Sequence, residues 1–99
     1  MTNTRRGHDT ERRCASLLRG QGYDVIRSAA SKSIWDIVAV GRFDIKLIQC
    51  KRTLRKTKSA AAPKSVIKEM EDALAPKNGC VSKQLWTWVD RQGWVVTTI

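Results

Sequence analysis

Two short apolar segments separated by a four-residue turn constrain the fold of this chain most strongly. They are Ile34–Val40 and Ile45–Lys51, and both contain the β-branched residues that favour strands. Gly41–Asp44 between them has the composition of a turn. The pattern therefore predicts two antiparallel strands joined as a hairpin.

The register of this hairpin decides which side chains share a face. A turn that is symmetric about its two central residues places Val38 opposite Leu47, and Asp36 opposite Gln49. Facing Cβ atoms lie ~4.5–5.5 Å apart, and alternate side chains of a strand share a face. Asp36, Gln49 and Lys51 are therefore expected to converge, whereas a slip of one residue would move Gln49 to the opposite face.

The remaining segments predict an α/β fold with a central mixed five-stranded sheet flanked by helices, in the order α-β-β-β-α-β-β. The further predicted elements are a helix over His8–Gln21 capped by Asp9 or Thr10, a strand over Tyr23–Arg27, an exposed segment over Arg52–Lys58, a helix over Pro63–Leu74, a turn at Asn78-Gly79, and strands over Lys83–Val89 and Trp94–Ile99. We expect residues 1–99 to form a single domain, with residues 1–6 as a flexible basic tail.

The net charge predicts a polyanionic partner. Nineteen Lys and Arg residues face nine Asp and Glu residues, which gives +10 at pH 7 over 99 residues. Nucleic acid is the first candidate and an anionic membrane surface the second, with a basic surface kept for solubility as the alternative. The sequence has no secretory signal and no apolar stretch of membrane-spanning length. We therefore expect an intracellular protein, in the cytoplasm or nucleoid, or in the host cytoplasm if the source is a virus.

Cysteine and histidine suggest no zinc centre. Cys14, Cys50 and Cys80 are widely spaced, and His8 is the only histidine. Without a C-x-x-C pair, neither a disulfide framework nor a zinc ribbon fits. Free thiols in a reducing compartment are the expected state.

Asp36 is unusual because aspartate is depleted in strands. One explanation is a structural Asp–Lys pair at a strand end. The functional one is a hard-cation site made of the Asp36 carboxylate, the Gln49 side-chain oxygen, the Cys50 backbone carbonyl and waters, which suits Mg²⁺. Lys51 would then orient or help deprotonate an attacking water, or neutralise a phosphate. The basic charge makes a phosphodiester the expected substrate.

Glu11 is a second polar residue at a position where the core is expected. It lies on the apolar stripe of the first helix, with Cys14 and Leu18. It is either a solvated glutamate favoured by the helix dipole or a carboxylate with a functional partner.

These residues resemble the PD-(D/E)xK nuclease superfamily, through Asp36 followed by Gln49-Cys50-Lys51 on the next strand and Glu11 on the preceding helix. The fuller string is similar to the archaeal-type Holliday-junction resolvases over residues 7–52. The segments that carry this resemblance are Gly7–Arg12, Leu17-Leu18, Gly22–Ala29, the loop with Ser31 and Ser33, Trp35–Ala39 and Leu47–Arg52.

The resemblance implies a restriction-endonuclease-like fold and a homodimeric endonuclease that depends on Mg²⁺, with Mn²⁺ able to substitute, and nicks four-way DNA junctions. Glu11, Asp36 and Gln49 would form the metal set, with Lys51 as the catalytic lysine. Either Ser31 or Ser33 would contribute from the loop. Arg5, Arg6, Arg27 and Arg52 would bind the DNA backbone.

Gln49 departs from the resolvase pattern, which has Glu at this position. The Mrr-type restriction endonucleases of the same superfamily read Q-x-K here, so the resemblance still favours an active enzyme. The alternatives are a related nuclease acting on flap or restriction-type duplex DNA, and a catalytically inactive DNA-binding module.

Further DNA contacts are expected from the basic run that follows the site, and from the loop before it. Arg55, Lys56 and Lys58 would track phosphates without reading sequence, and so would Lys32. The late tryptophans Trp86, Trp88 and Trp94 are expected in the core, with a dimer interface and base stacking as alternatives.

Overall fold

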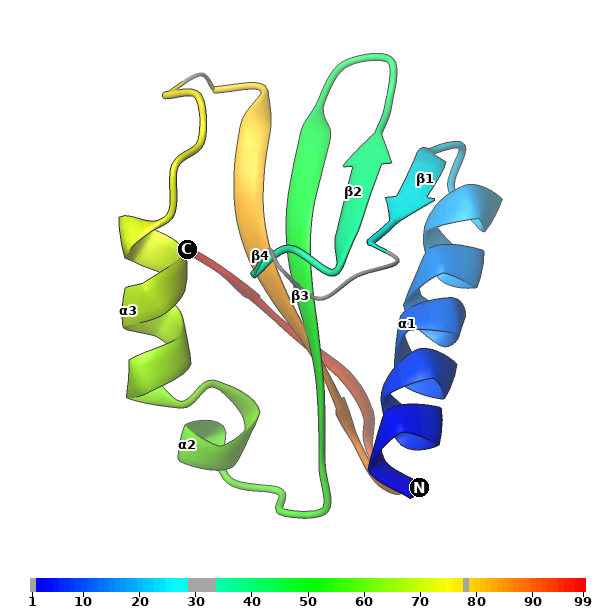
Figure 1. Ribbon diagram of the computed structural model, residues 1–99, viewed down its shortest axis with the longest axis vertical. Helices are drawn as coiled ribbons and strands as arrows, with labels where there is room; N and C mark the ends of the chain where they lie inside the picture. Colours follow the sequence, from blue (N-terminus) through cyan, green and yellow to red (C-terminus); the bar gives the residue numbers. More distant parts are fainter. Residues whose placement is uncertain (1, 29–33, 78) are drawn as a thin grey trace.

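The computed structural model describes the backbone of residues 2–28, 34–77 and 79–99, and the side chains of these residues from Asp9 onward. It contains one five-stranded sheet with helices on both faces (Figure 1). The elements are α1 (Thr2–Gly20), β1 (Asp24–Arg27), β2 (Ile37–Val40), β3 (Ile45–Thr53), α2 (Lys58–Ala61), α3 (Lys64–Asp72), β4 (Val81–Val89) and β5 (Gly93–Thr98). The predicted α/β class and mixed sheet are confirmed.

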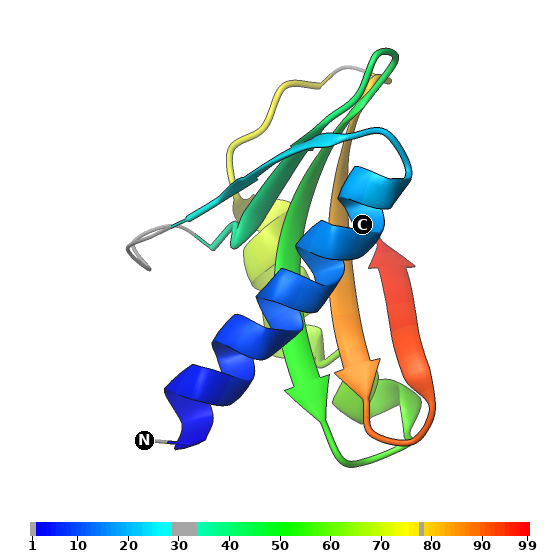
Figure 2. The ribbon, with the colours of Figure 1, turned by 90° about the vertical axis from the view of Figure 1, so that its right-hand side faces the viewer.

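The sheet has the spatial order β1-β2-β3-β4-β5. The pairs β1–β2, β2–β3 and β4–β5 are antiparallel, whereas β3 and β4 are parallel. A parallel pair needs a crossover, and α2 and α3 supply it. The helix α1 lies on one face of the sheet and α3 on the other (Figure 2).

The β2–β3 hairpin has the register that the sequence predicts. Val38 pairs with Leu47 and Val40 with Ile45, and the backbone N–H of Gly41 donates to the Asp44 carbonyl at 2.8 Å to close the turn. The β2 strand is shorter than predicted, because it begins at Ile37 rather than Ile34.

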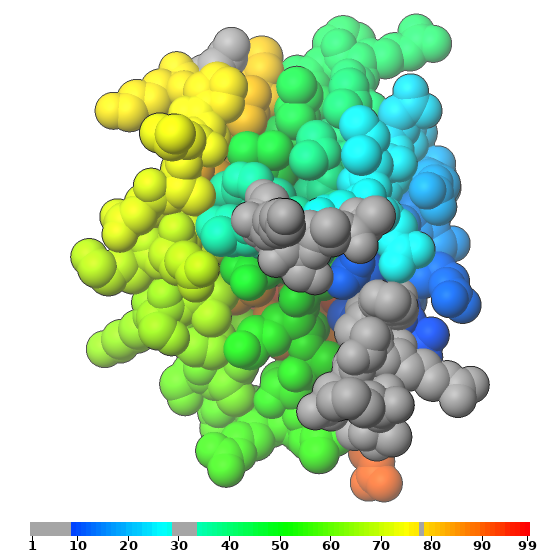
Figure 3. Space-filling view, viewed as in Figure 1, coloured from blue at the N-terminus to red at the C-terminus, as the bar shows by residue number. Residues whose placement is uncertain are grey.

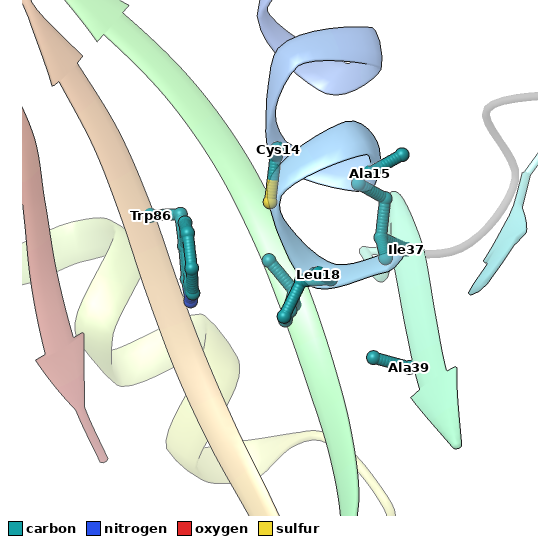
Figure 4. Packing of buried hydrophobic residues seen from close by; sticks show 7 residues of the cluster. Cys14, Ala15, Leu18, Ile37, Ala39 and Trp86 are labelled. Carbon is teal, nitrogen blue, oxygen red and sulfur yellow. The ribbon is translucent and has the colours of Figure 1, made fainter. Parts of the chain in front are cut away.

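The core beneath α1 is built from small helix residues and branched strand residues. Cys14 and Leu18 project from α1 onto the sheet (Figure 4). The fully or nearly buried members of this cluster are Cys14, Ala15, Leu18, Ile37, Ala39, Ile48 and Trp86. Met70 of α3 and the strand residues Leu85 and Val89 are buried apart from this cluster.

The predicted start of α1 and the predicted end of α3 were wrong. The helix α1 begins at Thr2 rather than His8, so Asp9 and Thr10 are not its cap and the backbone of residues 2–6 is helical instead of an irregular tail. A single Gly7 costs only ~1 kcal/mol in a helix interior. The helix α3 ends at Asp72, and Leu74 beyond it is 97% exposed.

The ends of α2 and α3 are set by contacts that the sequence pattern does not reveal. The Thr57 side chain accepts a hydrogen bond from the Ala60 N–H and so caps α2, a helix that the sequence did not predict. The Lys83 amine donates to three carbonyls at the end of α3, those of Met70, Glu71 and Ala73. Lys83 thereby satisfies carbonyls that a helix end leaves unpaired.

Tyr23 fastens the hairpin turn to the segment after α1. Its hydroxyl lies 2.8 and 2.9 Å from the two Asp44 carboxylate oxygens, and Lys46 lies 3.4 Å from the same carboxylate. A Cβ atom on Gly41 would lie 2.7 Å from the Tyr23 ring. Gly41 is therefore required for this approach.

We predict that Gly41→Ala lowers the free energy of unfolding by about 1–3 kcal/mol, the usual cost of overpacking. Urea unfolding followed by circular dichroism measures the change. Gly79→Ala is the matched control, because nothing lies within 4 Å of its added Cβ. Equal stability of the two variants would show that the Tyr23 contact does not constrain the turn.

Candidate nuclease site

Asp36 immediately precedes β2, at the end of the pairing between β2 and β3, and it forms two hydrogen bonds with β3. Its backbone N–H donates to the Ile48 carbonyl at 2.9 Å, and its Oδ2 atom accepts from the Cys50 N–H at 2.8 Å. The strand ladder ends at the pair Ile37–Ile48. The predicted cross-strand pair of Asp36 with Gln49 is therefore replaced by bonds to the residues on either side of Gln49.

The Asp36 carboxylate is held in a partly desolvated position. Burial raises the pKa of Asp36 above its ordinary 3.8, and the Cys50 N–H opposes that rise by stabilising the charged form. Because burial is the larger effect, the ionised carboxylate is less stable here than in water. A bound cation would offset this cost.

Gln49 supplies the second oxygen of the candidate site. Its Oε1 atom is buried and has no hydrogen-bond partner among the described residues. A buried acceptor without a partner costs about 1–3 kcal/mol, which is unusual outside functional sites. This orphaned oxygen, beside the Asp36 anchor point, fits a hard cation such as Mg²⁺.

Lys51 shares a face of the sheet with Gln49. Alternation along β3 puts these two side chains on one face and Cys50 on the other. In the parallel register Gln49 lies beside Leu85, and Lys51 lies beside Thr87. Thr87 donates its hydroxyl hydrogen bond to the Ala61 carbonyl. Gln49 and Lys51 therefore lie on the face covered by α2 and α3.

Glu11 projects from α1, on the other face of the sheet. Its carboxylate lies 3.7 Å from the Arg27 guanidinium of β1, and its side chain is 19% exposed. It is therefore largely buried and is not the solvated first-turn glutamate of the simpler alternative. The pairing with Arg27 holds Glu11 beside the start of the sheet.

Cys50 lies between the two carboxylates. A hydrogen bond with Cys14 and burial raise the pKa of the Cys50 thiol far above its ordinary value, and the charges of Asp36 and Glu11 raise it further. Both carboxylates are thus close enough to act on the residue next to Gln49. The thiol is neutral, so of Cys50 only the backbone carbonyl remains a candidate ligand.

The donor set is poor in charge. Within residues 9–28, 34–77 and 79–99, no three His, Cys, Asp or Glu side chains gather as a metal centre. The Asp36 carboxylate accepts from the N–H of Cys50, the residue after Gln49, whereas Glu11 projects from α1 on the opposite face of the sheet from Gln49. Such a set fits a hard cation that keeps several waters, as Mg²⁺ does.

The predicted DNA-binding residues separate into paired and unpaired cations. Arg27 pairs with Glu11, and Arg52 makes two 2.9 Å hydrogen bonds to Asp90, which raise the pKa of Arg52. Arg55, Lys56 and Lys58 are exposed beyond β3, in the segment at the lower end of the molecule in Figure 3. Ser31, Lys32 and Ser33 lie outside the described residues, as do the side chains of Arg5 and Arg6.

The late tryptophans form a ring cluster on the α1 face. Trp86 is 6% exposed and belongs to the core, as predicted. Trp94 packs edge-on against both Trp86 and Trp88, at centroid distances of 5.4 and 5.2 Å. Arg13 lies over the Trp88 ring at 4.2 Å, a contact that the sequence did not predict. Only the general basic character of α1 pointed to it.

We predict that Asp36→Asn stabilises the chain at neutral pH in metal-free buffer. The native pKa of Asp36 is raised, so wild-type stability falls as the pH increases through the window from 3.8 up to the native pKa. Asparagine keeps an acceptor for the Cys50 N–H and carries no charge. The unfolding midpoint of Asp36→Asn should therefore exceed that of the wild type at pH 7, and the difference should shrink toward pH 3.

Asp24→Asn is the control, because it removes the same charge from an exposed position in β1, and its unfolding midpoint at pH 7 should match that of the wild type. A destabilised Asp36→Asn at pH 7 would mean that the Cys50 hydrogen bond, rather than burial, dominates the energetics of Asp36.

Comparison with known proteins supports the fold and identifies a family. The family model described as archaeal Holliday junction resolvase (Hjc) matches residues 2–76 of the 99. A search of curated proteins gives no significant match. Among the described residues, no helix has the length and apolar character needed to cross a membrane. The family is one of junction-resolving nucleases, and its match spans α1, the hairpin and α3. The chain therefore belongs to the archaeal Holliday junction resolvase family.

Proposed function

We propose that this protein is a metal-dependent endonuclease that nicks four-way DNA junctions as a homodimer, using Mg²⁺ or, in its place, Mn²⁺. The observation that carries the proposal is the orphaned, buried Gln49 oxygen beside the point where Asp36 binds β3. Family membership supports the junction as substrate. The net charge of +10 supports binding to a polyanion.

Asp36 and Gln49 would hold the metal, with the Cys50 carbonyl as a further oxygen donor. Glu11 projects on the opposite face of the sheet from Gln49 and pairs with Arg27, so it is not proposed as a ligand of the same ion. When bound, Mg²⁺ would polarise the scissile phosphate and lower the pKa of a bound water. Asp36 contributes the negative charge that retains the ion. Gln49 contributes a neutral oxygen in place of the glutamate found in the resolvase pattern.

Lys51 would act on the phosphate rather than on the metal. It lies two residues from Gln49 and shares its strand face. A positive charge at this place stabilises the negative charge that develops as water adds to phosphorus and the leaving oxygen departs. Ser31 or Ser33 would assist from the preceding loop.

Backbone contacts would come mainly from residues outside the metal site. Arg55, Lys56 and Lys58 form an exposed basic segment that can follow phosphates without reading base sequence. Arg5, Arg6 and Lys32 would add to this charge, and Arg27 and Arg52 would contribute once a phosphate competes with their acidic partners. Two copies related by a two-fold axis would present two sites to a symmetric junction.

A catalytically inactive DNA-binding module is the second candidate. It is favoured by the low charge of the donor set, because no third carboxylate joins the site among the described residues. A related nuclease that cleaves flap or linear duplex DNA would use the same groups. Comparing the cleavage of four-way junction, flap and duplex DNA distinguishes these alternatives.

We predict that the wild-type protein makes paired, near-symmetric nicks in a labelled four-way junction in Mg²⁺ but not in Ca²⁺, and cleaves duplex and flap DNA more slowly. Asp36→Ala should reduce cleavage more than about 100-fold, since losing even an outer-shell partner of a metal ligand costs about 10–100-fold. Junction binding should persist in gel shifts.

Asp24→Ala, a carboxylate lost from the exposed edge strand, is the control and should cleave normally. Metal-dependent nicking that survives in Asp36→Ala would remove Asp36 from the mechanism. Tight junction binding without any nicking by the wild type would favour the inactive module.

We predict that Gln49→Glu lowers the Mg²⁺ concentration for half-maximal cleavage by about tenfold. A charged acceptor stabilises its partner by about 1 kcal/mol or more beyond what a neutral acceptor contributes. A difference of ~1.4 kcal/mol corresponds to a tenfold change in affinity. Thermal unfolding gives a readout besides activity, because Mg²⁺ should raise the melting temperature of Gln49→Glu more than that of wild type. Gln92→Glu in the exposed β4–β5 turn is the control. An unchanged Mg²⁺ dependence would argue against ligation at position 49.

A further inference from the structure

A groove on the α1 face lies apart from the candidate nuclease site. It runs between α1 and the beginning of β5, has a volume of about 800 Å³, and is lined by Arg12, Arg13, Leu17 and Trp94 among others. Figure 2 shows α1 crossing the sheet with β5 (red) at the edge of the molecule. The volume is within the range of ligand sites, ~300–1,000 Å³. Glu11 faces Arg27 of β1, at the opposite edge of the sheet.

Arg13 is held in place on the wall of this groove. Its guanidinium lies over the Trp88 ring, 4.2 Å from the centroid, which is close enough for a cation–π interaction. Arg13 takes part in no ion pair among the described side chains, whereas Arg27 and Arg52 are paired with acids. A guanidinium fixed by an aromatic ring loses less side-chain entropy when it binds a phosphate.

Trp94 provides an aromatic surface beside that cation. It lines the groove, is partly exposed, and is fixed by edge contacts with Trp86 and Trp88. Rigid aromatic rings next to basic side chains are the usual platform for bases of single-stranded nucleic acid. Leu17, at 42% exposure, extends the apolar part of the wall.

The groove is positive overall, although one carboxylate lines it. Asp9 lies 4.0 Å from the Arg12 guanidinium, and both side chains are more than half exposed. This i,i+3 pair is weak at such exposure. Arg13 remains as net positive charge, so the groove is complementary to a phosphate.

We propose that this groove binds an unpaired segment of DNA, with a phosphate on Arg13 and a base stacked on Trp94. The segment must be unpaired because a base within a duplex has both faces covered by its neighbours. The inference rests on the proposed function only in taking DNA as the substrate class. It adds a second contact that would retain unpaired strands near a branch or a flap.

The test measures binding of a fluorescein-labelled 12-nucleotide oligothymidylate by anisotropy, together with quenching of tryptophan fluorescence. Arg13→Gln should weaken binding by about tenfold, as for a lost charged hydrogen bond, and reduce the log–log salt slope by about 0.7. Lys64→Gln, the same charge change on α3 across the sheet, is the matched control and should have a much smaller effect.

Trp94 gives an independent test. Trp94→Leu should weaken oligothymidylate binding at least about fivefold, and Trp94→Phe should restore most of the affinity because it retains an aromatic ring. Melting temperatures of both variants establish that they fold. If Trp94→Leu does not fold, the quenching by oligothymidylate and its loss in Arg13→Gln decide the question.

Several results would overturn the inference. The first is an equal loss of oligothymidylate affinity in Arg13→Gln and Lys64→Gln, and the second is an absence of tryptophan quenching. The third is Arg13-dependent binding of a polyglutamate peptide that is tighter than the binding of DNA. The fourth is a change of oligomeric mass in Arg13→Gln, which would make the groove an interface between copies. Junction cleavage is scored separately. If junction cleavage is normal but both variants lose affinity equally, only the inference about the groove is wrong. If cleavage is absent but quenching depends on Arg13, only the proposed function is wrong.

Discussion

The hydrogen bond from the Cys50 N–H to the Asp36 carboxylate is the interaction on which the site depends. It ends the pairing of β2 with β3, because the side chain takes the amide that a longer β2 would have bonded. The same bond fixes a carboxylate beside Gln49. Burial makes that charge costly, and the Gln49 Oε1 atom has no hydrogen-bond partner among the residues that the structure describes. These two unfavourable groups are the features on which the proposal of a cation site rests.

The hairpin could be predicted from the sequence because its register follows from local pattern. The apolar side chains of both strands must lie on the same face of the sheet to be buried, and a four-residue turn allows one symmetric pairing of the two strands. The ends of the elements could not be predicted in the same way. The strand β3 extends to Thr53 because β4 pairs with it along its whole length, and α3 ends early where Lys83 takes its carbonyls. Both are contacts between distant segments.

The candidate site residues could be named from the sequence, but their arrangement could not. Alternation correctly groups Gln49 with Lys51, because period two holds within a regular strand. It fails for Asp36, which lies one residue outside the ladder, where the backbone no longer alternates regularly. The paired state of Arg52 was equally hidden, since its partner Asp90 is 38 residues away.

These pairings change how the charge of +10 acts on DNA. A phosphate that binds Arg52 must displace Asp90, so little net charge is neutralised and little salt dependence results. A phosphate on Arg13 displaces no carboxylate and keeps the Trp88 contact. Arginines paired with acids would therefore add little salt-dependent affinity for DNA, whereas cations outside ion pairs would add more. Of the cations around the candidate metal site, Arg27 and Arg52 would therefore contribute least to the electrostatic attraction that brings DNA to it.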